Sequence, residues 1–208
     1  MLTQARKKLA LELFDIGAVK FGAFKLKLHE KKPDAPLSPI YIDLRVLRSF
    51  PLVMDSAVEV YKELVAGLKF NLYADVPTAA TPIVAVLSHK TKTPMVSPRP
   101  EKKEHGLTGN VDGVFRKGQI AVVIDDLVTT ADSKLEAIST LEGNGLSIND
   151  VVVLVDREQG GVQELEKRGY TCHVAFKLSH LLRIYLESGK ISQPMYERTM
   201  AYLESDHN

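Results

Sequence analysis

The amino-acid sequence predicts a doubly wound α/β domain whose mainly parallel sheet is flanked by helices. The first observation is a series of short, continuous apolar runs, which are typical of strands buried on both faces of a sheet. The second is the helical periodicity between most of these runs, because alternating strand and helix favours a parallel sheet. The third is the length of 208 residues, which fits one domain. The predicted strands are 72–74, 95–96, 120–124, 151–155 and 172–176.

The predicted helices follow in chain order. The first covers residues 3–14, with Thr3 as its N-cap and with Leu9 and Leu13 on one apolar face. The second begins near Asp55, and its apolar positions 58, 61, 65 and 68 point toward a core. Further helices are expected at about 80–91, 133–142 and 161–168, and two more within 178–204. Helices are thus available to cover both faces of the predicted sheet.

The charge balance and the cysteine content restrict the function classes. Twenty-seven Lys and Arg residues against 26 Asp and Glu residues leave a formal net charge of +1, whereas a general nucleic-acid binder depends on phosphate neutralisation. The single cysteine, Cys172, excludes an intramolecular disulfide, and no Cys/His cluster has the spacing of a zinc site. We therefore expect no nucleic-acid partner and a reducing, cytoplasmic compartment.

The hydropathy pattern contains no membrane segment. No stretch approaches the ~20 apolar residues of a membrane-spanning helix. Basic residues at positions 6–8 precede an apolar run, but Glu12 and Asp15 interrupt it at once, so it has no signal-peptide h-region. We expect a soluble protein with no membrane partner.

Two segments fit neither the strand nor the helix pattern. Residues 27–39 contain three prolines, and residues 99–118 contain four glycines among many charged side chains. Loops longer than ~12–15 residues inside a compact domain are usually functional or disordered. Both interpretations stay open for these two segments.

The most informative stretch is 120–142. The strand at 120–124 runs into Asp125 and Asp126, a threonine-rich turn follows, and Ser133 and Glu136 have capping-box spacing at the start of a helix. Open α/β sheets bind ligands beyond the carboxyl ends of their strands, where a helix N-terminus offers N–H donors to an anion. The hydroxyls suit a phosphate monoester, and the two carboxylates suit sugar hydroxyls or a hydrated Mg²⁺. The alternative is a plain turn that Asp132 or Ser133 caps.

This stretch resembles the phosphoribosyl pyrophosphate (PRPP) signature of the type I phosphoribosyltransferases. Other segments narrow the resemblance to the orotate phosphoribosyltransferase family, and it runs over nearly the whole chain. Those segments are 24–27 and 38–45, which resemble the orotate-contacting region; 76–79, the pyrophosphate-side turn; 99–106, the mobile catalytic loop; and 155–161, the Asp-Arg-x-x-Gly-Gly segment. The last of these is the most specific.

The resemblance implies a role for each matching residue. In the PRPP site it places Asp125, Asp126, Thr129, Thr130, Ala131, Asp132 and Ser133, with Arg99, Lys103 and His105 on the pyrophosphate. In the orotate site it places Lys27, Tyr41, Ile42, Thr129 and Arg157. The residues implied to be catalytic are Lys103, His105, Arg99, Asp125 and Asp126. A guanidinium such as that of Arg157 suits the orotate carboxylate because it can donate two parallel hydrogen bonds.

The resemblance also implies an architecture and a reaction. One phosphoribosyltransferase domain would cover 1–208, and about 1–45 would form a small hood over the base site. The enzyme would be a pentosyltransferase of pyrimidine biosynthesis that makes orotidine 5′-monophosphate, with Mg²⁺ as the cofactor carried by PRPP and held through water by Asp125 or Asp126. It would act as a homodimer with shared active sites, and a separate orotidine monophosphate decarboxylase would be a further partner.

Several positions depart from the family pattern. Residues 28–36 look like an insertion beside the base site, Pro100 stands where a lysine is usual, and Asp75 and Ala131 stand where glycine is usual. Asp132 adds a carboxylate to the phosphate loop, and we expect it to point away from the phosphate. Two alternatives therefore stay open: a phosphoribosyltransferase for a different base, and a PRPP-sensing regulatory protein that has lost turnover.

Overall fold

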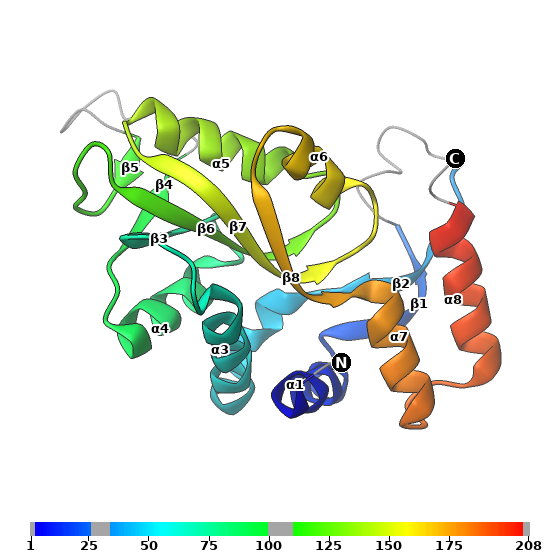
Figure 1. The fold of residues 1–208 in the computed structure, drawn as a ribbon. Helices are drawn as coiled ribbons and strands as arrows, with labels where there is room; N and C mark the ends of the chain where they lie inside the picture. Colours follow the sequence, from blue (N-terminus) through cyan, green and yellow to red (C-terminus); the bar gives the residue numbers. More distant parts are fainter. Residues whose placement is uncertain (1–2, 26–33, 100–109, 206–208) are drawn as a thin grey trace.

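The computed structural model describes residues 3–25, 34–99 and 110–205 (Figure 1). Its strands are β1 (Val19–Phe24), β2 (Ser38–Ile42), β3 (Leu72–Asp75), β4 (Met95–Pro98), β5 (Val111–Asp112), β6 (Ile120–Val128), β7 (Ser147–Asp156) and β8 (Thr171–Lys177). Its helices are α1 (Gln4–Asp15), the 3-10 helix η1 (Leu44–Ser49), α3 (Pro51–Val65), α4 (Thr81–Thr91), α5 (Asp132–Gly143), α6 (Gly161–Lys167), α7 (Leu178–Glu187) and α8 (Gln193–Ser205). Each strand and helix predicted from the sequence has a counterpart among these elements.

The central sheet has six strands in the order β5-β4-β3-β6-β7-β8. All neighbouring strands pair in parallel except β4 and β5, which are antiparallel. The chain moves outward from β3 to β4, then returns to the other side of β3 with β6 and continues to β7 and β8. The prediction of a doubly wound, mainly parallel sheet flanked by helices is confirmed, and the winding reverses between β3 and β6.

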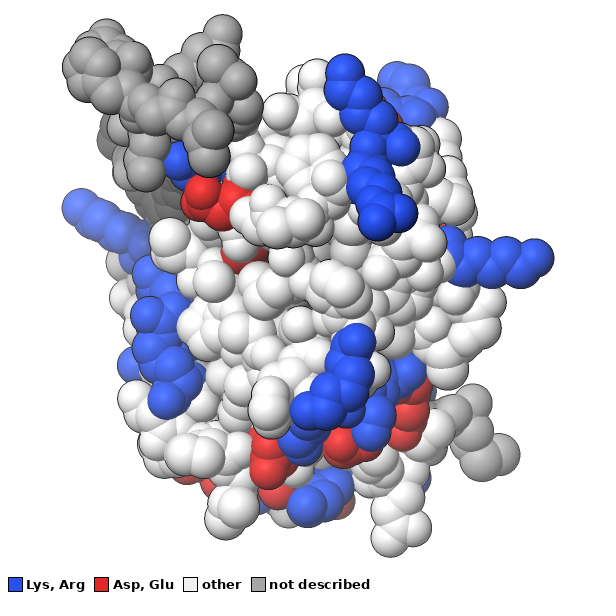
Figure 2. Space-filling view, turned by 90° about the vertical axis from the view of Figure 1, so that its left-hand side faces the viewer, with Lys and Arg blue, Asp and Glu red and all other residues white. Residues whose placement is uncertain are grey.

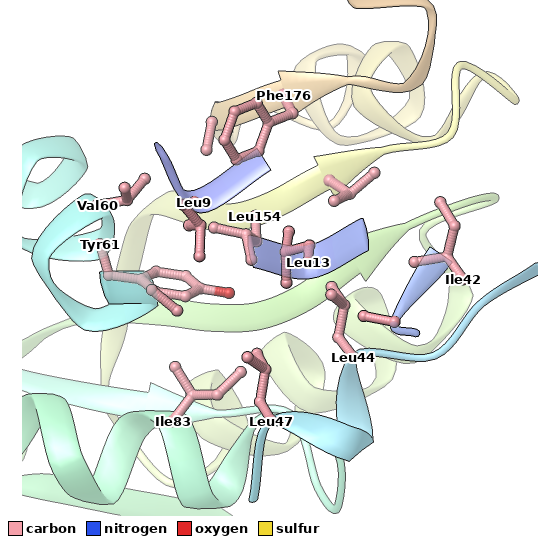
Figure 3. Close-up of a cluster of buried hydrophobic side chains, with 14 of the residues drawn as sticks. Leu9, Leu13, Ile42, Leu44, Leu47, Val60, Tyr61, Ile83, Leu154 and Phe176 are labelled. Carbon is pink, nitrogen blue, oxygen red and sulfur yellow. The ribbon is translucent and has the colours of Figure 1, made fainter. Parts of the chain in front are cut away.

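Helices cover both faces of this sheet. Figure 1 shows α5 and α6 above the sheet and α1, α3, α4 and α7 below it. Because neighbouring side chains of a strand point to opposite faces, Ala121 and Val123 of β6 belong to the core under α5, whereas Val122 and Ile124 belong to the other core. The latter, larger core joins Leu9 and Leu13 of α1 to the sheet and to α3, α4 and α7 (Figure 3).

A separate two-stranded sheet lies near the N-terminus. β1 and β2 pair antiparallel, with Val19 opposite Ile42 and Phe21 opposite Ile40. These strands fall within the region, about 1–45, in which a hood is expected, and that role stays a prediction. In the part of the chain that the structure describes, no helix combines the length and the apolar character that crossing a membrane requires.

Two local details differ from the sequence predictions. α3 begins at Pro51 rather than near Asp55, because proline fits the first helical position, where no N–H partner is needed. The predicted capping box is wrong: the N-cap of α5 is Ala131, it makes no side-chain hydrogen bond, and Ser133 already lies inside the first turn. At the first helix, by contrast, Thr3 is the N-cap and accepts a hydrogen bond from the Arg6 N–H, as predicted.

Candidate functional site

The acidic pair lies at the end of β6, beside the point where the sheet reverses its winding. β6 continues to Val128, so Asp125 and Asp126 belong to the strand and not to the turn that follows. Both are almost completely buried, with 4% and 8% of their surfaces exposed. The Asp126 N–H donates to Asp125 Oδ1 at 2.8 Å, and the Leu127 N–H donates to Asp126 Oδ1 at 2.8 Å. The backbone therefore orients both carboxylates.

A buried ion pair joins this strand to the helix after it. Lys134, in the first turn of α5, places its Nζ 2.6 Å from Asp125 Oδ2, and each side chain is only 5% exposed. The same ammonium lies 3.4 Å from the hydroxyl of Ser133. Both oxygens of the Asp125 carboxylate thus have a partner, one from the backbone and one from Lys134.

Tyr61 of α3 supports the acidic pair from the core side. Its hydroxyl donates to the backbone carbonyl of Asp125 at 2.7 Å, and its side chain is fully buried (Figure 3). Burial, followed by the nearby charges of Asp126 and Asp125, raises the pKa of Tyr61 well above its usual value. The hydroxyl therefore stays protonated and acts as a donor.

Asp126 differs electrostatically from an ordinary carboxylate. Burial first, and the neighbouring Asp125 second, raise its pKa to about 7, while the charge of Lys134 lowers it in part. Two adjacent carboxylates in a dry site disfavour double ionisation. At neutral pH Asp126 therefore has both its protonated and its ionised form populated, and perturbed groups of this kind are frequent in ligand sites.

The turn after β6 has the geometry of an anion-binding loop. Ala131 has a left-handed backbone, with φ of 69°, and is 2% exposed. This conformation starts α5 at Asp132 and leaves the first N–H groups of the helix without a side-chain cap. The Thr130 hydroxyl donates to Asp132 Oδ2 at 2.8 Å, so the added carboxylate is engaged within the turn.

The neighbouring turn after β7 packs directly on this loop. A Cβ atom on Gly161 would lie 2.3 Å from the Thr129 carbonyl oxygen and 2.6 Å from a methyl of Val128. Only glycine allows this approach. The second glycine of the Asp-Arg-x-x-Gly-Gly segment therefore fixes the distance between the two turns.

Arg157 is held in the same place from two sides. Its backbone N–H donates to the Val128 carbonyl at 3.0 Å, and the residue is only 7% exposed. The carboxylate of the next residue, Glu158, accepts from the N–H of Ser179 at 2.8 Å and from its hydroxyl at 3.1 Å, at the start of α7. Arg157 is thus a buried residue beside the turn after β6 and not a surface arginine.

Arg99 approaches the phosphate loop from β4. Arg99 and Ser133 line one cavity of about 90 Å³ together with Val76 and Pro77, the turn after β3. The Arg99 N–H donates to the Asn110 carbonyl at 2.7 Å. Lys103 and His105, the other predicted pyrophosphate ligands, lie outside the described residues.

The predicted base-site residues are divided between two sheets. Tyr41 and Ile42 lie on β2, where Tyr41 stacks against Phe24 with ring centroids 5.6 Å apart and accepts a hydrogen bond from Arg45. Arg157 and Thr129 lie at the large sheet, and Lys27 lies outside the described residues. The described structure therefore brings together 125–133, Arg157 and Arg99, while Tyr41 and Ile42 occupy the small sheet.

For several residues of this site, the sequence does not predict the contacts that they make. Lys134 follows Ser133 directly and has the appearance of an ordinary exposed residue of a first helical turn. Tyr61 has the periodicity of a core residue, and its hydroxyl contact with β6 depends on how α3 packs. Asp75, a departure from the family pattern, is fully buried at the end of β3 and accepts a hydrogen bond from the Thr81 hydroxyl. These contacts arise between elements, so no local pattern marks them.

The described acidic side chains limit the kind of metal ion that this site could bind. Within 3–25, 34–99 and 110–205, no cluster of three or more His, Cys, Asp or Glu side chains could hold a metal ion. Two carboxylates, one of them paired with Lys134, suit a hydrated Mg²⁺ that also binds substrate phosphates, which is how Mg²⁺ is usually held. The residues present therefore fit a substrate-borne ion and not a protein cage.

A larger groove of about 510 Å³ lies between α1, β8 and α7. Basic side chains of Arg6, Lys177 and Arg183 line it together with apolar residues. It contains none of the residues predicted for catalysis or binding, so the site is assigned to the smaller cavity at the β3–β6 switch point, where open α/β sheets bind ligands.

Comparison with known proteins gives a consistent set of relatives. No family model matches the chain. The orotate phosphoribosyltransferase of Pyrobaculum aerophilum is 36% identical over 171 residues, which cover 82% of this chain and 86% of that protein. The bifunctional enzyme PyrF/PyrE of a Nostoc species is 32% identical over 188 residues, covering 90% of this chain and 38% of that protein.

Solved structures agree with these relatives. UMP synthase of Leishmania donovani superimposes with a TM-score of 0.86 and 36% identity, over 97% of this chain and 42% of that one. Orotate phosphoribosyltransferase of Aeropyrum pernix gives a TM-score of 0.71 and 28% identity, over 87% of this chain and 99% of that one. The chain thus spans about two fifths of the Nostoc and Leishmania proteins and nearly all of the Aeropyrum chain's length.

Proposed function

Because the chain belongs to the orotate phosphoribosyltransferase family, we propose that it transfers the 5-phosphoribosyl group of PRPP to orotate. The products are orotidine 5′-monophosphate and pyrophosphate, a step of pyrimidine biosynthesis. The observation that carries this proposal is the convergence of the phosphate loop after β6 with a buried Arg157, whose N–H donates to Val128 at 3.0 Å. The turn after β6 suits a phosphate, the guanidinium of Arg157 suits a carboxylate, and both lie at the end of β6.

The PRPP end of the site uses the turn after β6. Backbone N–H groups at the start of α5 and the hydroxyls of Thr129, Thr130 and Ser133 hold the 5′-phosphate. Asp125 and Asp126 face the ribose hydroxyls. The left-handed backbone of Ala131, with φ of 69°, supports this role because it opens the helix N-terminus toward the ligand.

The base end of the site uses Arg157. Its guanidinium holds the orotate carboxylate through two parallel hydrogen bonds, and Thr129 contacts the ring from the neighbouring turn. Lys27, Tyr41 and Ile42 complete the base site from the N-terminal region. Support for Arg157 comes from its burial and from the close contact of Gly161 with Thr129, which keeps the two turns in register.

The reaction is a displacement at the anomeric carbon of ribose. A ring nitrogen of orotate forms the new bond to this carbon and releases its proton to the departing pyrophosphate or to water, while the bond between the carbon and the pyrophosphate oxygen breaks. The transition state has oxocarbenium character. Arg99, Lys103 and His105 neutralise the charge that develops on the departing pyrophosphate. Catalysis then comes from alignment and electrostatics and requires no covalent enzyme intermediate.

Mg²⁺ belongs to this proposal as a companion of PRPP. Asp125 or Asp126 would hold it through water, and the ion would add positive charge at the pyrophosphate. The adjacent carboxylates of Asp125 and Asp126 at the end of β6 support this assignment, because carboxylate oxygens are preferred ligands of Mg²⁺ and its waters.

We propose a homodimer with shared active sites. Figure 2 shows the side of the molecule that bears β5 and α4 in Figure 1. Uncharged residues form a band across its middle, and Lys and Arg lie above and below this band, the lower ones mixed with Asp and Glu. Val114, just after β5, is 91% exposed. The uncharged band, together with this exposed apolar side chain, supports association of two copies.

The cellular context is proposed from the same relatives. A separate orotidine monophosphate decarboxylase would consume the product, and the length of the bifunctional Nostoc protein beyond the matched 38% supports a second activity close by. We place the enzyme in the cytoplasm, without nucleic-acid or membrane partners. The single cysteine and the net charge of +1 support this context.

Turnover tests the proposed function directly. The purified chain is mixed with PRPP, Mg²⁺ and orotate, and the loss of orotate absorbance is followed. Arg157→Ala should raise the KM for orotate by roughly 100-fold, since a charge-assisted bidentate contact contributes about 3 kcal/mol. Arg168→Ala, which removes an exposed arginine paired with Glu164, is the matched control and should leave turnover unchanged. An inactive wild-type chain that still binds PRPP contradicts the orotate assignment and favours a different base or a sensing role.

A further inference from the structure

We infer that Lys134 is a positioning residue of the PRPP site, whose buried ammonium neutralises the Asp125 carboxylate and fixes it beside Asp126. This inference rests on the proposed function, because it concerns how the same site accepts PRPP. It assigns a role to a residue that neither the sequence pattern nor the resemblance identified. Lys134 does not need to touch the substrate, since it acts through Asp125.

The geometry gives Asp125 a single orientation. Its Oδ2 lies 2.6 Å from Lys134 Nζ, and its Oδ1 accepts the Asp126 N–H at 2.8 Å. The Tyr61 hydroxyl holds the carbonyl of the same residue at 2.7 Å. With both carboxylate oxygens and the carbonyl engaged, the Asp125 side chain cannot turn away from the end of β6.

The position of Lys134 in its helix also needs an explanation. It occupies the first turn of α5, where the positive end of the helix dipole disfavours a cation. Its side chain is 5% exposed, and lysines are almost never buried unless they are paired. Helix stability alone therefore does not account for a lysine here, whereas a partner at the end of β6 does.

The charge of the site shows what the pair contributes. Asp125, Asp126 and Asp132 place three carboxyl groups within or beside a turn that must accept a phosphate. Asp125 and Asp126 are almost completely buried, so repulsion between an incoming anion and these two groups is weakly screened. The ammonium of Lys134, 2.6 Å from Asp125 Oδ2, offsets one of these charges. Burial first, and the neighbouring Asp125 second, raise the pKa of Asp126 to about 7, and the charge of Lys134 lowers it in part.

Two variants and one control test this role. Lys134→Met keeps the length of the side chain and removes its charge, and Lys167→Met removes an exposed lysine at the end of α6 as the control. In the double variant Asp125→Asn/Lys134→Met, neither partner leaves a buried charge, so the double variant is expected to fold even if the single variant does not. The readouts are the Kd for PRPP by calorimetry with Mg²⁺, the KM values for both substrates, and the melting temperature.

Lys134→Met should weaken PRPP binding at least tenfold and change the KM for orotate less than threefold, while Lys167→Met changes neither. The double variant should regain the melting temperature and still bind PRPP at least tenfold more weakly, because the fixed carboxylate is gone. Wild-type PRPP affinity in either variant would overturn the inference, since a purely stabilising ion pair predicts that result. A wild-type chain that binds PRPP but does not transfer its phosphoribosyl group to orotate would contradict the proposed function only. The Kd values for PRPP would still test the role of Lys134.

Discussion

The turns after β6 and β7 both lead from a parallel strand into a helix through a residue with a left-handed backbone, but this residue differs between them. β7 ends in Asp156, and β6 carries Asp125 and Asp126 shortly before its last residue, Val128. Each following helix begins after a left-handed residue that makes no side-chain cap. In the β6 turn this residue is Ala131, with φ of 69°, and in the β7 turn it is Gly160, with φ of 86°.

The two turns show two separate requirements: one is a left-handed backbone at the residue before the helix, and the other is close contact with the neighbouring turn. A left-handed alanine costs about 1 kcal/mol, which α5 tolerates because Ala131 is buried in the core beneath the helix. Gly161, by contrast, does not have a positive φ and is required by contact, since its Cβ would overlap the Thr129 carbonyl. The β6 turn thus contains a strained backbone at Ala131. The β7 turn has no Cβ at Gly161, and this lets the two turns pack in contact.

The largest expected effect comes from filling that space. Gly161→Ala would force the β7 turn and Thr129 apart, with a loss of about 3 kcal/mol in the free energy of unfolding, the upper part of the range for overpacking. Displacing the phosphate loop by about 1 Å should lower turnover roughly 100-fold. Urea denaturation and steady-state kinetics measure the two effects.

The matched control for this change is Gly143→Ala. Gly143 lies at the end of α5, and a Cβ there would meet nothing within 4 Å, so a small gain in stability is expected. If Gly161→Ala behaves like Gly143→Ala, the two turns are not held by this contact.

The acidic residues of the β6 turn give an intermediate effect that depends on pH. Burial raises the pKa of Asp126 from an ordinary value of 3.8 to about 7 in the folded chain, so between these values the folded state holds a proton that the unfolded state has lost. Stability therefore falls as pH rises from about 4 to about 7. Asp126→Asn removes this loss and should stabilise the protein by about 2 kcal/mol more at pH 8 than at pH 5.

Melting temperatures at the two pH values check this prediction. Asp132→Asn changes an exposed carboxylate in the same turn and serves as the control, with no such pH-dependent gain. Equal gains for Asp126→Asn at both pH values would contradict the raised pKa. Turnover of Asp126→Asn should fall most at pH 8, where Asp126 of the wild-type chain is ionised and offers the ribose a carboxylate acceptor.

The smallest effect concerns the left-handed residues themselves. Ala131→Gly should raise the free energy of unfolding by about 0.5 kcal/mol, since relief of strain exceeds the extra freedom of glycine in the unfolded chain. Gly160→Ala, whose Cβ would meet nothing within 4 Å, should lower it by about 1 kcal/mol. Chemical denaturation of the pair checks both signs, and a stabilising Gly160→Ala would show that the two turns differ in backbone requirement.

The site was only partly visible in the sequence. The strand, the acidic pair and the threonine-rich turn were predicted because they are consecutive in the chain, and the structure places them at the winding reversal. The predicted capping box at Ser133 is wrong because Ala131 turns the backbone into the helix two residues earlier. The buried pair of Lys134 and Asp125 was missed because a lysine in a first helical turn has no pattern that distinguishes a buried side chain from an exposed one.

The sequence by itself determined the five parallel strands, the alternating helices and the order in which the site segments occur. Continuous apolar runs and helical periodicity are local signals, and burial on both faces of a sheet imposes them wherever the strand lies. Only the tertiary structure decided which strands are neighbours, how closely Gly161 approaches Thr129, and which carboxylate Lys134 neutralises. These depend on distances between elements, which are set when side chains from separate parts of the chain pack to the density of a protein interior.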